Sequence, residues 1–121
     1  MNNDQITPLQ AIRDKAHAFA QERNFLPFHN IKDLTMNLAC EVAELQELML
    51  WKSPDELKAR LLQDPAFKEA VFDEIGDVMH ALAELANRIE GCDLTTAFFE
   101  KMRKTEAKYD PALCYGKGEK R

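Results

Sequence analysis

The amino-acid sequence predicts an all-α protein, an antiparallel bundle of four main helices with one additional short helix. Three observations favour this fold class. Apolar residues recur at helical spacing along most of the chain, capping residues that begin helices recur between these segments, and strand signals are nearly absent. The connections are short, so consecutive helices should run antiparallel. A length of 121 residues favours a single domain over residues 1–121.

The first two main helices each follow a residue that can cap a helix. Thr7 precedes a proline and should cap a helix over about residues 8–23. Asn30 stands three residues before Asp33, an arrangement that starts a second helix, which we expect over about residues 31–52. We therefore place a short loop between these helices.

The middle of the chain carries two stronger start signals. Ser53-Pro54-Asp55-Glu56 is a capping box for a short helix over about residues 54–62. Asp64-Pro65 opens a long helix that we expect over about residues 65–90, with Gly91 ending it. Asp93 then caps a last helix to about residue 109, and residues 110–121 are expected to form a loose tail.

Composition restricts the class of partner. The net charge of −5 argues against a nucleic acid polymer, because phosphate backbones require clustered Lys and Arg, but it does not exclude a single nucleotide held through metal ions. We expect no membrane partner, because no apolar run approaches the roughly 18 residues of a membrane span. Cys40, Cys92 and Cys114 form no CxxC motif and indicate reduced thiols in a cytoplasmic protein. Cys40 and Cys92 are expected to pack in or near the core.

The second helix carries unneutralised acids beside its apolar stripe. Between residues 34 and 51 the only charged residues are Glu41, Glu44 and Glu47. At 100° per residue, Glu41 lies within about 60° of Leu34, Leu38 and Leu45, and Glu44 falls at the edge of that stripe. A carboxylate in such a stripe is costly to bury unless something neutralises it.

The long helix repeats the arrangement with Glu74 and Asp77. Glu74 lies in the apolar stripe of this helix and Asp77 lies at the edge of the stripe. Residues 69–87 include several Asp and Glu residues but no Lys or Arg. If the two helices pack together, four carboxylates converge and require a cation. Oxygen ligands without His or Cys favour Mg²⁺, with Mn²⁺ as the alternative, and Mg²⁺ indicates phosphate chemistry.

Two other interpretations of these acids stay open at the level of sequence. Acidic helix edges are commonly solvated or paired with Lys or Arg. A di-iron bundle is a second metal interpretation, although it expects Glu-x-x-His, and Glu44 and Glu74 are followed three residues later by Glu47 and Asp77.

Gly76, in the middle of the long helix, is expected to allow close approach by a neighbouring helix or ligand, since glycine is unfavourable there.

Together these residues resemble the all-α nucleoside triphosphate pyrophosphohydrolases of the MazG-like superfamily, most of all the dCTP pyrophosphatase branch. The resemblance covers about residues 28–109 and includes the ExxE motif, a spacer of 29 residues and the ExxD motif. Further matching segments are Phe28-His29, Cys40-Glu-Val-Ala-Glu-Leu45, Trp51-Lys52, Asp73-Glu-Ile-Gly-Asp-Val78, Lys101-Met102 and Tyr109.

The resemblance implies hydrolysis of a nucleoside triphosphate to a monophosphate and pyrophosphate. Glu41, Glu44, Glu74 and Asp77 would hold Mg²⁺, and Glu41, or alternatively Glu47, would activate water. Substrate contacts would come from Phe28, His29, Trp51, Lys101, Thr105 and Tyr109. Members of this family are usually homodimers or homotetramers, and the apolar residues on further faces of the second helix are consistent with such an assembly.

The chain departs from the family pattern at three positions. Thr105 stands where the family often has asparagine, Asp110 where it has proline, and Ala81 where the dCTP branch has an aromatic residue of the base pocket. Ala81 widens that pocket or changes its selectivity, so dCTP, dATP and modified nucleotides all stay open. The alternative from another functional class is a non-catalytic acidic adaptor, which would have no reason to place acids in apolar stripes.

Overall fold

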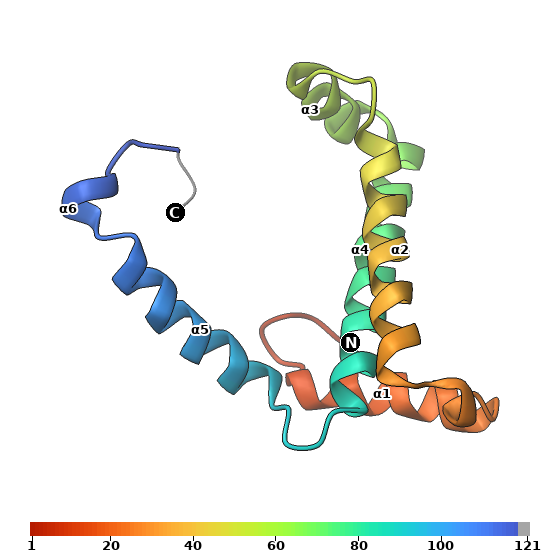
Figure 1. Ribbon diagram of the computed structural model, residues 1–121. Coiled ribbons are helices and arrows are strands. Elements are labelled where there is room, and N and C mark those ends of the chain that lie inside the picture. Colours follow the sequence, from red (N-terminus) through yellow and green to blue (C-terminus); the bar gives the residue numbers. More distant parts are fainter. Residues whose placement is uncertain (119–121) are drawn as a thin grey trace. The chain divides into compact units, whose positions relative to one another are not determined.

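The computed structural model describes residues 1–118 and confirms the all-α class, since this part of the chain contains helices and no strand. The chain divides into two units, Met1–Glu90 and the segment from Gly91 onward, which are described separately. Figure 1 shows the elements in order: α1 (Leu9–Glu22), the 3₁₀ helix η1 (Leu26–Phe28), α2 (Ile31–Met49), α3 (Pro54–Gln63), α4 (Pro65–Asn87), α5 (Leu94–Lys108) and α6 (Pro111–Cys114).

Four of the expected helix caps are present. The side chains of Asn30, Ser53, Asp64 and Asp93 each accept a hydrogen bond from a backbone N–H three residues later, at 2.8, 3.1, 3.1 and 3.0 Å. The expectation for Thr7 is wrong. Its hydroxyl accepts a hydrogen bond from the backbone N–H of residue 3 at 3.1 Å, because the N-terminal segment turns back on itself, and α1 starts without a side-chain cap.

Two helix ends and the C-terminal segment differ from the sequence-based expectation. α2 ends at Met49, before Trp51 takes a left-handed φ of 65°. α4 ends at Asn87, and Gly91, with φ of 78°, lies in the loop that follows and is not the first residue past the helix. The segment expected to be loose contains the short helix Pro111–Cys114, capped by the Asp110 side chain; residues 119–121 of that expected tail lie outside the described residues.

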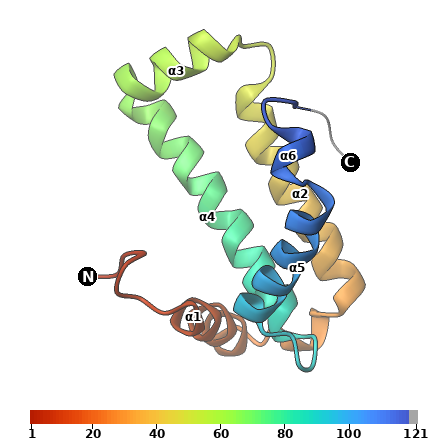
Figure 2. The ribbon, with the colours of Figure 1, turned by 90° about the vertical axis from the view of Figure 1, so that its left-hand side faces the viewer.

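The first unit is built around the antiparallel pair α2 and α4, which make the most extensive contact between elements. In Figure 1 the two helices run side by side, with α3 joining them at one end and α1 crossing near the other. Figure 2 shows the same pair from a second direction, with α3 linking their upper ends. Two hydrogen bonds connect α1 to α4 through Asn87. Its side chain accepts one from Arg13 Nε and donates the other to the Arg13 carbonyl, both at 2.9 Å.

The core of the first unit is narrow and consists mostly of small side chains. Its buried apolar residues are Ala16, Ala20, Leu34, Phe67, Val71, Ala81, Ala83 and Ala86. The buried alanines lie on α1 and α4, which contact each other, whereas larger apolar residues such as Met36 and Phe72 are exposed. Cys40 is also exposed, so its expected place in the core is wrong, because it lies on the side of α2 away from Leu34.

Gly76 is not closely packed within the chain. A Cβ built at Gly76 would meet no heavy atom within 4 Å, so the expected close approach of a neighbouring helix is wrong for a single chain. In the part of the chain that the structure describes, no helix is long and apolar enough to cross a membrane.

Candidate metal centre

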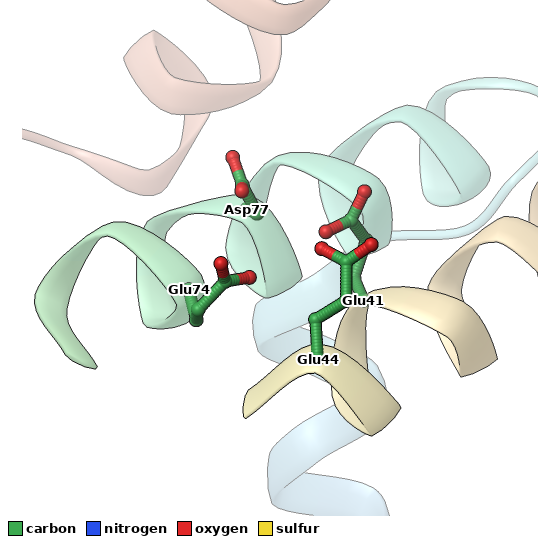
Figure 3. Close-up of side chains that lie close together, drawn as sticks. All are labelled: Glu41, Glu44, Glu74 and Asp77. Carbon is green, nitrogen blue, oxygen red and sulfur yellow. The ribbon is translucent and has the colours of Figure 1, made fainter. Parts of the chain in front are cut away.

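The four acids expected to converge do so. Glu41 and Glu44 from α2 and Glu74 and Asp77 from α4 each offer an oxygen atom, and these oxygens all lie within 4.8 Å of one another. Figure 3 shows the two pairs facing each other across the contact between the helices. The convergence follows from the sequence, because the i, i+3 pairs stand in the same relation to the two apolar stripes that pack together.

The electrostatics of this cluster are those of crowded carboxylates. Burial raises the pKa of Glu41, and the neighbouring charges of Glu44, Asp77 and Glu74 raise it further. Burial likewise raises the pKa of Glu74, with Glu44 and Asp77 adding to the effect. One oxygen each of Glu41 and Glu74 is buried without a hydrogen-bond partner among residues 1–118. The cluster therefore favours either protons or a cation.

These acids fit a hard divalent cation. All four donors are carboxylates, and no ion pair in the described part of the chain joins any of them to Lys, Arg or His. The buried oxygens of Glu41 and Glu74 also weaken the interpretation as a solvated acidic edge, because they have lost water without gaining a partner. Oxygen-only sets of this kind suit Mg²⁺ or Mn²⁺.

The histidines of the first unit near this cluster do not join it. His80 is exposed and lies edge-on to the Phe19 ring, with 5.3 Å between centroids. His29 is half-buried and its Nδ1 lies 3.4 Å from Oε1 of Glu84. A di-iron site of the Glu-x-x-His type is therefore disfavoured. Glu47 is exposed and stands outside the four acids, to which Glu41 belongs, and the choice between the two as the water-activating carboxylate stays a prediction.

The residues expected to form the base pocket do not all meet within one chain. His29 stands before α2 and Trp51 after it, so the 19 residues of the helix separate them by about 28 Å. Trp51 is 99% exposed and Phe28 is 73% exposed. A single chain can therefore offer His29 or Trp51 to a given base, but not both.

The expected phosphate-binding residues belong to the second unit. Lys101 and Thr105 lie on α5, and the Thr105 hydroxyl donates a hydrogen bond to the Lys101 carbonyl at 3.0 Å. Tyr109 is the C-cap of α5 and is half-buried. Because the units are described separately, the roles of Lys101, Thr105 and Tyr109 stay predictions.

Two cavities adjoin the acids within the first unit. The larger, of about 720 Å³, lies between the N-terminal segment, α1 and α4 and reaches Gly76 and Asp77. The smaller, of about 160 Å³, is lined by Glu41 and Asp77 and also by His29 and Glu84. Sequence reasoning did not single out Glu84. Its position within the apolar run Ala81-Leu-Ala-Glu-Leu-Ala86 was the signal that could have identified it.

Comparison with known proteins places the chain in a family. No model of a known protein family matches the chain. The dCTP pyrophosphatase 1 of Rattus norvegicus is 36% identical over 108 residues, a stretch that covers 89% of this chain and 62% of that protein. The human dCTP pyrophosphatase 1 is 34% identical over 105 residues, covering 87% and 61%. The crystal structure of a pyrophosphatase from Archaeoglobus fulgidus matches with a TM-score of 0.76 and 30% identity, over 91% of this chain and 99% of that one.

The chain belongs to the MazG-like superfamily. The expectation drawn from the ExxE and ExxD motifs is thereby confirmed at the level of family and fold. The chain spans about 62% of the length of the curated relatives it matches. In this MazG-like chain, the paired acids of α2 and α4 form a group that could hold a metal ion.

Proposed function

We propose that this chain is a Mg²⁺-dependent nucleotide pyrophosphatase that cleaves a nucleoside triphosphate into the monophosphate and pyrophosphate. The observation that carries the proposal is the convergence of four carboxylates without a neutralising partner on adjacent helices. The names of the relatives support the reaction class, and they favour dCTP or a related deoxynucleotide as substrate. Removal of unwanted nucleotides from the cellular pool is the role that fits this reaction.

The acids would act in two ways. Glu41, Glu44, Glu74 and Asp77 would hold Mg²⁺, which supplies charge neutralisation at phosphate oxygens and a lowered pKa for bound water. Glu41 would orient the attacking water and accept its proton as the new bond to the α-phosphorus forms. The bond from that phosphorus to the bridging oxygen breaks, and pyrophosphate leaves with the bond's electron pair.

The assembly we propose is a homodimer or homotetramer of a cytoplasmic protein. Large apolar side chains on α2 and α4 are exposed, among them Met36, Val42, Phe72 and Ile75. Exposed apolar surface of this kind is typical of an interface. A second copy would also supply the Trp51 that one chain cannot bring to His29. Light scattering on the purified protein would decide between a dimer or tetramer and a monomer, and a monomer would contradict this assembly.

Pyrophosphate release from a panel of deoxynucleoside triphosphates with Mg²⁺ tests the function directly. We expect release by the native protein, and strong loss in Glu41→Gln and Asp77→Asn. Glu69→Gln is the matched control, because Glu69 is exposed on α4 and stands outside the four acids. Failure with every nucleotide, or full activity in both cluster variants, would favour a non-catalytic adaptor.

A further inference from the structure

A second acidic group in the first unit is not explained by the metal centre. Glu84 is 3% exposed and lies among the buried alanines Ala81, Ala83 and Ala86. Its Oε1 lies 3.4 Å from Nδ1 of His29, but its Oε2 is buried and has no partner within the described residues. A buried carboxylate oxygen without a hydrogen-bond donor is energetically costly, so Oε2 of Glu84 is suited to accept a hydrogen bond from a ligand.

Glu84 and the metal centre line the same small cavity. Glu84 follows Asp77 by seven residues on α4, which is about two helical turns, or roughly 10 Å along the axis. The cavity of about 160 Å³ has His29 and Glu84 as well as Glu41 and Asp77 in its lining, together with the rings of Phe19 and Phe25. Since a water molecule takes about 30 Å³ in the liquid, the cavity has room for roughly five waters, which suits one heterocyclic ring and not a whole nucleotide.

The position of His29 is fixed by its neighbours. Its Nδ1 meets Glu84, and its backbone carbonyl accepts a hydrogen bond from Nε of Arg88 at 3.3 Å. The Phe25 ring lies beside the imidazole, with 6.4 Å between centroids. His29 therefore acts as a positioning residue for one oxygen of Glu84 and leaves the other oxygen for a ligand.

We propose that Glu84 reads the exocyclic amino group of the substrate base, so that the site selects amino-bearing bases over uracil and thymine. An ionised carboxylate only accepts hydrogen bonds, and Glu accepting from the cytosine amino group is an established pairing. Uracil and thymine present a carbonyl oxygen at the same position, which would face the carboxylate without a hydrogen. This inference rests on the proposed function, because the phosphates at the four acids are what would bring the base to Glu84.

The test compares dCTP with dUTP, which differ in the base at this edge. For the native protein we expect kcat/KM for dCTP to exceed that for dUTP by at least about tenfold, as expected for a hydrogen bond to a charged group. In Glu84→Gln the amide can donate as well as accept, so the ratio should fall toward one. Glu69→Gln should keep the native ratio. Binding of dCMP and dUMP by calorimetry gives the same comparison without turnover, and the native protein alone suffices for it.

Three results would overturn the inference, and they separate it from the proposed function. Equal cleavage of dCTP and dUTP, with equal binding of dCMP and dUMP, would remove the base preference while the pyrophosphatase function stands. An unchanged ratio in a folded, active Glu84→Gln would show that Glu84 only positions His29. If the native protein cleaved no nucleoside triphosphate, both the proposed function and this inference would be contradicted.

Discussion

Binding of Mg²⁺ should stabilise the first unit against heat. The four oxygens of Glu41, Glu44, Glu74 and Asp77 lie within 4.8 Å of one another in the folded chain, and the unfolded chain cannot hold them together. A ligand that binds only the folded state at 100 times its dissociation constant contributes about 2.7 kcal/mol. For a unit of 90 residues, Met1–Glu90, each kcal/mol raises Tm by about 4–8 °C, so the rise should be about 10–20 °C.

The Glu41→Gln variant gives this prediction a second signature. Burial and the neighbouring carboxylates raise the pKa of Glu41, so its charge is costly in the folded state, and the metal-free variant that lacks this charge should melt above the metal-free native protein. The same variant should lose most of the Mg²⁺-dependent rise, because it has lost a ligand. Glu69→Gln, exposed on α4, should respond to Mg²⁺ as the native protein does.

Scanning calorimetry or fluorescence-monitored melting with EDTA and with increasing Mg²⁺ measures both effects. The reasoning would be refuted if Mg²⁺ and Mn²⁺ left the native Tm unchanged up to millimolar concentrations. It would also be refuted if Glu41→Gln showed the full native response.

Four further predictions follow from other parts of the first unit. With EDTA present, stability should fall as pH rises from 4.5 through the raised pKa values of Glu41 and Glu74, because the folded state holds these protons more tightly; melts that show stability rising over this window would contradict the sign. Phe67→Ala should cost about 3–5 kcal/mol in urea unfolding, since Phe67 is 6% exposed, and a cost below 1 kcal/mol would show that this core position is loosely packed. Ser53→Ala should cost about 1 kcal/mol through the lost cap, with Ser53→Gly nearer neutral. Gly76→Ala should raise the unfolding free energy of the metal-free protein by up to about 1 kcal/mol, and a loss would reveal a close contact at this position.

Local signals in the sequence predicted much of the fold. The caps at Asn30, Ser53, Asp64 and Asp93 are where the sequence places them, because a capping hydrogen bond involves residues only three apart. The convergence of the acids was also predictable, since both pairs have the same angular relation to a stripe that must be buried. The caps thus depend on local sequence, and the convergence of the acids depends on helical periodicity.

Features set by contacts between distant residues were missed. The contact between half-buried His29 and buried Glu84 joins residues 55 positions apart, and nothing in the local pattern of either residue indicates the other. The separation of His29 from Trp51 follows from the length of α2, which the sequence predicted, but the motif resemblance assigned both residues to one base pocket without using that length. Thr7 was expected to cap α1, but its hydroxyl accepts a hydrogen bond from the backbone N–H of residue 3, a turn within the N-terminal segment that the cap pattern does not indicate.

The products formed from dCTP in the presence of Mg²⁺ test the central claim most directly. Chromatography of the reaction should show dCMP and pyrophosphate in equal amounts, with no turnover in EDTA and with strong loss in Asp77→Asn. Formation of dCDP with orthophosphate would move the cleaved bond away from the α-phosphate. The absence of any product from dCTP and from every other nucleoside triphosphate would contradict the account.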